Sequence, residues 1–90
     1  MNRSEISSYE ESYKLDDWLG DKIGAGLGRK VKEGTERNDD TRTRSLYDIE
    51  GSRVIVVSDR YIPFHEEVRA EQGIKGQLEE AGILPEQHSK

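Results

Sequence analysis

The sequence predicts an α+β fold: an N-terminal helix, one β-hairpin formed by residues 45–50 and 53–58, and one or two C-terminal helices. Three observations predict it. Apolar residues recur at every fourth position from residue 15 to residue 31, which is a helical spacing. A Gly-Ser pair at residues 51–52 separates two β-prone runs. A second helical pattern follows Pro63.

The N-terminal helix is expected to begin at Ser8, because Ser8-Tyr9-Glu10-Glu11 has the capping-box pattern. Its apolar row ends at Val31, and Gly34 is a natural residue just past a helix end. A second row consists of Gly20, Gly24 and Gly28. Such a row would allow another backbone to pack closely. Alternatively, residues 20–28 form a loop or a break in the helix.

The hairpin is expected to turn at Gly51-Ser52 in a type II′ conformation, and this turn fixes the strand register. Glu50 then faces Arg53 and Arg44 faces Asp59, so that both charged pairs have opposite signs. One face of the hairpin is apolar and carries Tyr47, Ile49, Val54 and Val56.

The second strand of the hairpin is apolar on both sides, which is typical of a central, covered strand. The sequence contains no third convincing strand, and an isolated two-stranded ribbon is marginal in water. A second copy of the chain is therefore expected to complete the sheet about a two-fold axis. The interface of this predicted homodimer is Val54, Ile55, Val56 and Val57. Alternatively, a helix of the same chain covers the strand.

The predicted organisation is a flexible N-terminus over residues 1–7, a single small α+β domain over residues 8–84, and a C-terminal tail over residues 85–90. Within the domain, residues 34–43 are polar and turn-rich and are expected to form a mobile loop. The last helix is expected to begin at Pro63 and to end before Gly82.

Composition restricts the function classes. Charged residues make up 37% of the 90 residues and the net charge is −5, which disfavours a general nucleic-acid binder. The chain has no cysteine, so it has neither a disulfide framework nor a cysteine-based zinc site. No apolar run of membrane-spanning length occurs, and we expect a cytoplasmic protein without a transmembrane segment.

No motif predicts catalysis, a cofactor or a metal. His65-Glu66-Glu67 lacks the second histidine of a zinc protease because position 69 is arginine. Asn38-Asp39-Asp40 lacks the spacing of a calcium loop, and the glycines of residues 24–30 lack the spacing of a phosphate-binding loop. The protein is therefore predicted not to be an enzyme.

The remaining signal is for protein binding. Aromatic side chains carry much of the energy at interfaces, and acidic side chains favour a partner with a basic surface. The candidate partner-binding residues are Trp18, Tyr13, Glu66, Glu67, Glu79 and Glu80. For Trp18, packing in the core is the alternative. The function that this pattern favours is a small acidic binding module, an inhibitor or adaptor of the phage or mobile-element accessory type.

Three further functions stay open. A strand followed by two helices and shared across a dimer resembles ribbon-helix-helix DNA-binding regulators, although their strands carry polar side chains and Val54–Val57 carries none. A small anionic ligand at the dimer cleft would meet Arg29, Lys30, Arg42 or Arg44. Trp18–Val31 could also associate with a membrane surface.

Overall fold

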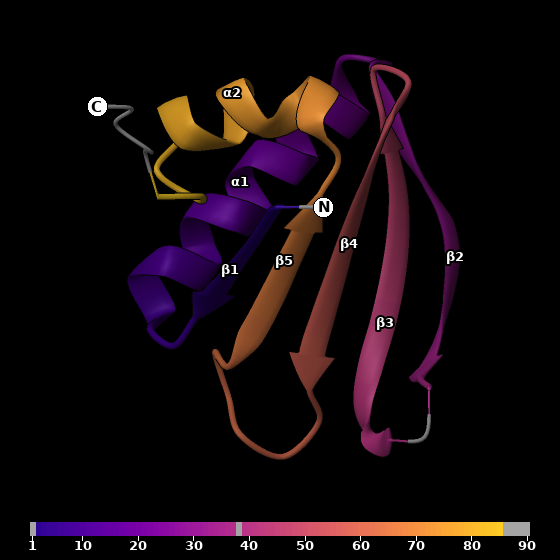
Figure 1. Ribbon diagram of the computed structural model, residues 1–90, viewed down its shortest axis with the longest axis vertical. Helices are drawn as coiled ribbons and strands as arrows, with labels where there is room; N and C mark the ends of the chain where they lie inside the picture. Colours follow the sequence, from indigo (N-terminus) through magenta and orange to yellow (C-terminus); the bar gives the residue numbers. More distant parts are fainter. Residues whose placement is uncertain (1, 38, 86–90) are drawn as a thin grey trace.

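The computed structural model describes residues 2–37 and 39–85. In chain order the elements are β1 (Asn2–Ile6), α1 (Tyr9–Gly24), β2 (Gly28–Glu36), β3 (Asp39–Ile49), β4 (Ser52–Asp59), β5 (Glu66–Ala70) and α2 (Gln72–Glu80). The strands form one antiparallel sheet in the order β1-β5-β4-β3-β2 (Figure 1). The predicted α+β class is confirmed, but strands dominate where the sequence predicted a single hairpin.

Both helices cover the same face of the sheet, and the hydrophobic core lies between them and the strands. Side chains alternate along a strand, so every second residue of β4 and β5 faces this core. The buried residues that pack there include Leu15 and Leu19 of α1, Val54 and Val56 of β4, Val68 and Ala70 of β5, and Ile74 and Leu78 of α2. The opposite face, which neither α1 nor α2 covers, is called the open face below.

The turn between β3 and β4 consists of Glu50-Gly51 and not of Gly51-Ser52. Both turn residues have positive φ, 52° and 85°, as a type I′ turn requires. Ile49 therefore pairs with Ser52 instead of Val54. The predicted register is wrong by two residues.

A shift of two residues leaves each side chain on the face that the sequence predicted, because the side-chain period of a strand is two. Charge pairing did not reveal the error, because the true register also creates two pairs of opposite sign. Asp48 faces Arg53, and Arg42 faces Asp59. The apolar face is thus confirmed although the register is not.

The strand β4 is central within its own chain. One of its edges pairs with β3 and the other with β5, where Val56 faces Val68. The predicted dimer interface, Val54, Ile55, Val56 and Val57, is buried inside one chain. This prediction is corrected: β5 occupies the place that was assigned to a second copy, and β4 has no free edge.

Two segments predicted to be irregular form strands instead. Within residues 1–7, β1 pairs with β5 at the edge of the sheet. Within residues 34–43, the ends of β2 and β3 pair with each other, for example Gly34 with Arg44. Except for Pro85, the predicted tail over residues 85–90 lies outside the described residues.

The helix α1 begins as predicted and ends earlier. The backbone amide of Glu11 donates to Oγ of Ser8 at 3.2 Å, which confirms the cap. The helix ends in a Schellman motif, in which Gly26 has φ 76° and the amide of Leu27 donates to the carbonyl of Lys22 at 2.9 Å. The continuation of the helix towards Val31 is wrong, since β2 follows.

The predicted glycine groove does not form either. A Cβ atom added to Gly20 or Gly24 would meet no described atom within 4 Å, so no backbone packs against them. Gly28 is different. It lies in β2 beside Ile49, whose Cδ1 atom would be 2.3 Å from an added Cβ.

The segment after Pro63 forms a turn and then β5, not a helix. The next helix, α2, ends in the predicted Schellman motif, in which Gly82 has φ 77° and the amide of Ile83 donates to the carbonyl of Leu78 at 2.9 Å. Because a strand and not a helix follows β4, the strand-helix-helix element of the DNA-binding hypothesis is absent from residues 52–80.

Candidate functional site

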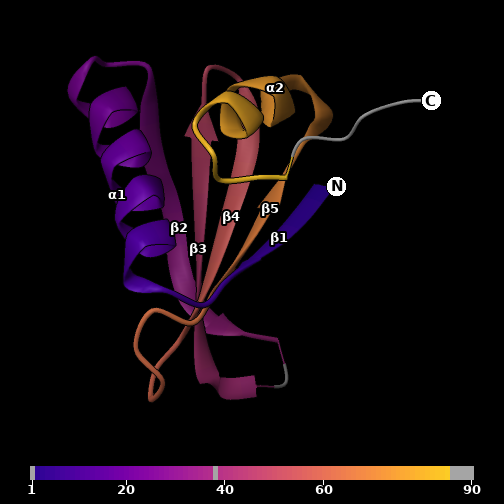
Figure 2. The ribbon, with the colours of Figure 1, turned by 90° about the vertical axis from the view of Figure 1, so that its left-hand side faces the viewer.

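Large apolar side chains are exposed at the start of α1 and in the loop between β4 and β5. The exposed fractions are 62% for Tyr9, 58% for Tyr13, 76% for Tyr61, 56% for Ile62 and 45% for Phe64. We call these five residues the aromatic surface. In Figure 2 the loop lies at the lower end of the sheet, on the same side as α1.

Ring contacts join the two segments. The rings of Tyr9 and Phe64 meet edge to face, with centroids 5.1 Å apart and an interplanar angle of 88°. Tyr9 and Tyr13 lie one helical turn apart, with ring centroids separated by 6.1 Å. The rings of Tyr13, Tyr9 and Phe64 therefore form one continuous group that joins the helix to the loop.

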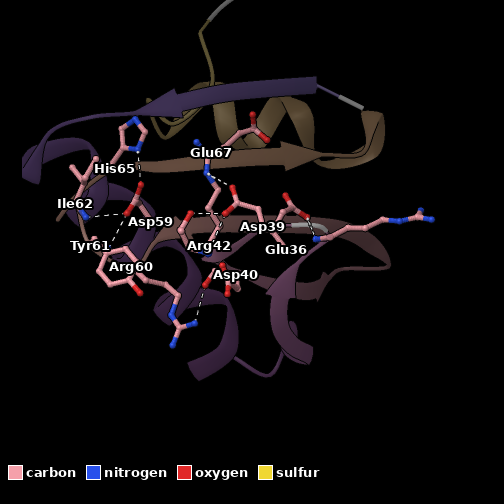
Figure 3. Close-up of polar contacts among 12 residues, drawn as sticks. Glu36, Asp39, Asp40, Arg42, Asp59, Arg60, Tyr61, Ile62, His65 and Glu67 are labelled. Atoms are coloured by element: carbon pink, nitrogen blue, oxygen red, sulfur yellow. Dashed lines mark hydrogen bonds and ion pairs between the residues drawn. The ribbon is translucent and has the colours of Figure 1, made fainter.

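The carboxylate of Asp59 shapes the loop. Its Oδ1 atom accepts hydrogen bonds from the backbone amides of Tyr61 at 2.8 Å and Ile62 at 2.9 Å (Figure 3). Its Oδ2 atom lies 3.7 Å from Nδ1 of His65, across the loop. Asp and Asn side chains commonly stabilise turns in this way.

These hydrogen bonds also change the acidity of Asp59. The amides of Tyr61 and Ile62 stabilise the charged carboxylate and hold its pKa below the ordinary value of 3.8. Partial desolvation acts against this lowering, and the nearby side chains of His65 and Arg42 add to it. The loop geometry shown in Figure 3 therefore depends on an ionised Asp59.

Arg60 ties the loop to the neighbouring β2–β3 hairpin. Its amide donates to the carbonyl of Thr41 at 2.9 Å, and its guanidinium donates to the carbonyl of Asp40 at 2.9 Å. The hydrogen bonds of Asp59 and Arg60 together hold the backbone that carries Tyr61 and Ile62.

Phe64 lies in an unusual backbone conformation. Its φ angle of 59° is in the left-handed region, which a bulky residue rarely adopts. Such a conformation costs about 1–3 kcal/mol and is found most often at functional sites. Here it places the ring against Tyr9 while almost half of the side chain stays exposed.

The aromatic surface continues into acidic residues along α1. Tyr13, Asp17 and Asp21 follow one another at intervals of four, so they lie on the same side of the helix. Asp16 is exposed beside them. We call Asp16, Asp17 and Asp21 the acidic row.

Of the two predicted aromatic binding residues, the structure places one on this surface. Tyr13 is exposed and belongs to it. Trp18 is half-buried and packs against the core, with Nζ of Lys22 5.8 Å from its ring centroid. Packing against the core, the alternative that the sequence left open for Trp18, is therefore observed.

The four predicted glutamates do not form one surface. Glu66 accepts hydrogen bonds from the hydroxyls of Ser12 at 2.9 Å and Ser58 at 3.1 Å, so it holds α1 on the sheet. Glu67 lies on the open face and accepts a hydrogen bond from Arg69.

The other two glutamates are on α2. Glu79 forms an ion pair with Lys75 at 3.8 Å, and Glu80 is exposed at the helix end. Neither lies in the segments that carry the aromatic surface.

The candidate binding residues predicted from the sequence did not include Tyr9, Tyr61, Ile62 and Phe64 of the aromatic surface. One signal was available. Tyr61, Ile62 and Phe64 surround Pro63 and follow Asp59-Arg60, so three large apolar residues stand in a segment with turn-forming residues. Apolar residues in such a segment are either covered by a core element or left for a partner.

Among residues 2–37 and 39–85, no group of three or more His, Cys, Asp or Glu side chains is arranged to hold a metal ion. In the same residues, no helix has the length and the apolar character that a membrane crossing needs.

Comparisons of the chain with protein-family models, with curated proteins and with solved structures give no match.

Proposed function

We propose that this chain is a small non-enzymatic binding module that acts in the cytoplasm on a protein partner, as an inhibitor or an adaptor. The observation that supports the proposal is the aromatic surface, which is exposed although its loop is held by the hydrogen bonds of Asp59 and Arg60 and its helical part belongs to α1. A fixed apolar surface loses little conformational entropy when a partner covers it.

The area of the aromatic surface suits an interface. Fully covering the exposed parts of its five side chains would bury roughly 600 Å². A standard interface takes about 800 Å² from each partner. The aromatic surface would thus supply the apolar centre, where tyrosines commonly contribute most of the binding energy.

The acidic row favours a partner with a basic surface. Asp17 and Asp21 extend the line of Tyr9 and Tyr13 along α1. Charges at the rim of an interface mainly steer association and select the partner. The preferred partner therefore has an apolar pocket bordered by lysine or arginine side chains.

Affinity capture from the native host, with tagged protein and mass spectrometry, tests the proposal. The informative variant is Tyr13→Ser combined with Tyr61→Ser, since both residues are more than half exposed and can change without loss of the core. The matched control is Glu80→Gln, an exposed position at the end of α2. We expect one specific partner with the wild type and the control, and at least a tenfold loss (about 1.4 kcal/mol) with the double variant.

Equal capture by the double variant, with its circular-dichroism melting curve unchanged, would show that this surface does not bind the partner.

A further inference from the structure

A second site lies on the open face, away from the aromatic surface. The β2–β3 hairpin bends at its tip to the side opposite α1 (Figure 2). Beneath this bend is a pocket of about 430 Å³, lined by Thr35, Glu36, Arg37, Arg44 and Arg69. We call it the arginine pocket. Its volume is within the range of about 300–1,000 Å³ that is usual for small-molecule sites.

The sheet register explains why the arginines converge. Arg69 of β5 faces Ile55, and Arg44 of β3 faces Val57, so both arginines lie on the open face. Arg3 of β1 is directly opposite Arg69, which places two like charges side by side. Arg3, Arg44 and Arg69 thus share the open face of a chain whose net charge is −5, and Glu67 on the same face pairs with Arg69.

Of the described residues that line the pocket, only Glu36 is an acid, and it lies where a bound anion would lie. Its Oε2 atom accepts a hydrogen bond from Nη2 of Arg69 at 2.9 Å, and its Oε1 atom is 3.8 Å from Nε of Arg44. Its side chain is only 14% exposed. The carboxylate therefore marks a position that the two guanidinium groups hold for an oxyanion.

The pocket has donors left for a ligand. Among the described residues, the Arg44 guanidinium has only the 3.8 Å ion pair with Glu36. The Arg37 guanidinium has no partner within that same part of the chain, and the residue is exposed. Arginine donates in a planar fork that matches the oxygens of phosphate and carboxylate.

We propose that the arginine pocket binds a small phosphate-bearing molecule with two or more negative charges, which displaces the carboxylate of Glu36. Three arginine residues line the pocket, and two carboxylates pair with them, Glu36 within the lining and Glu67 beside Arg69, so one positive charge stays uncompensated. Among the described residues, no aromatic side chain lines the pocket, so a nucleobase would find no aromatic ring to stack on. Recognition is therefore of the phosphate group itself. The proposal is independent of the protein-binding function above.

Isothermal titration calorimetry with inorganic pyrophosphate tests the proposal, and citrate at the same ionic strength serves as the carboxylate arm. The variants are Glu36→Gln, which removes the internal competitor, and Arg44→Gln, which removes a donor but keeps much of the side-chain stem. The control is Arg53→Gln, which removes an exposed cation of β4 outside the pocket. Circular dichroism confirms that each variant is folded.

We expect pyrophosphate to bind the wild type. We also expect Glu36→Gln to bind it about tenfold more tightly and Arg44→Gln about tenfold more weakly, with Arg53→Gln unchanged. If neither the wild type nor Glu36→Gln binds pyrophosphate at millimolar concentration, the pocket is a structural ion-pair network and the proposal is wrong. Equal weakening by Arg53→Gln would show nonspecific attraction, and tighter binding of citrate would overturn the phosphate assignment.

Discussion

Asp59 is the residue on which the shape of the aromatic surface depends. It ends β4, accepts two amides of the following loop and faces His65. Asp59 does not belong to the hydrophobic core, and no part of α1 depends on it. Changes at Asp59 should therefore alter the loop and leave the rest of the molecule in place.

The first prediction concerns the pH dependence of this loop. Because the pKa of folded Asp59 is lowered, the carboxylate stabilises the loop above its unfolded pKa, and this stabilisation is lost as the pH falls through the folded pKa. NMR shifts of the Tyr61 and Ile62 amides should titrate with a midpoint below 3.8. The step should vanish in Asp59→Asn and persist in Asp40→Asn. A midpoint at or above 3.8 would contradict the geometry.

The second prediction separates binding from stability at Phe64. Phe64→Gly removes a partly exposed ring and also relieves a left-handed backbone angle of 59°, which glycine adopts without strain. The free energy of unfolding in urea should change by less than about 1 kcal/mol. Partner affinity should fall at least about tenfold. A destabilisation of about 3 kcal/mol would instead assign the ring to the core.

At the scale of elements, replacing glycine by alanine at two positions of α1 and its end should change the free energy of unfolding in opposite directions. Gly20→Ala places a methyl group in open space on α1 and should stabilise the protein by about 0.8–1 kcal/mol. Gly26→Ala forces a side chain onto a φ of 76° at the helix end and should destabilise it by about 1–2 kcal/mol. Urea unfolding measures both. Changes of the same sign would show that α1 does not end at its Schellman motif.

The central position of β4 makes a further prediction. Val56 faces the core and Val57 the open face, and both are buried. Replacing either by alanine should lower the free energy of unfolding by about 2 kcal/mol. In β2, Val31 is 47% exposed, and Val31→Ala should change stability by less than about 0.5 kcal/mol. A negligible effect at Val57 would mean that the open face is not packed around it.

The sequence predicted the helix caps and the faces of the hairpin because these depend on neighbouring residues. For the other segments, apolar residues spaced four apart led to the wrong prediction of a helix. Residues i and i+4 lie on the same side of both a helix and a strand, so this spacing alone does not distinguish the two elements. Only the pairing with distant strands decided for β2 and β5.

The candidate site was predictable only in part for a related reason. Tyr13 was identified from its residue type and its place on an amphipathic helix. Phe64 joins Tyr9 through a contact between residues 55 positions apart in the chain, which no local pattern contains. Arg44, Arg69 and Glu36 likewise meet only because three strands place them together.

At the scale of the whole molecule, the two proposed sites lie on different sides. The exposed side of α1 carries the acidic row beside the aromatic surface. The open face carries Arg44 and Arg69 of the arginine pocket, and other cations of this face stand opposite acids, Arg53 opposite Asp48 and Arg42 opposite Asp59. The two proposed sites should operate independently.

Titration of the captured partner into ¹⁵N-labelled protein, followed by NMR, tests the central claim most directly. We expect chemical-shift changes at Tyr9, Tyr13 and the loop between β4 and β5, and smaller changes along the acidic row. The amides of β2 and of the arginine pocket should not shift. Shifts confined to β2 or to the open face, with the aromatic surface unaffected, would contradict the account.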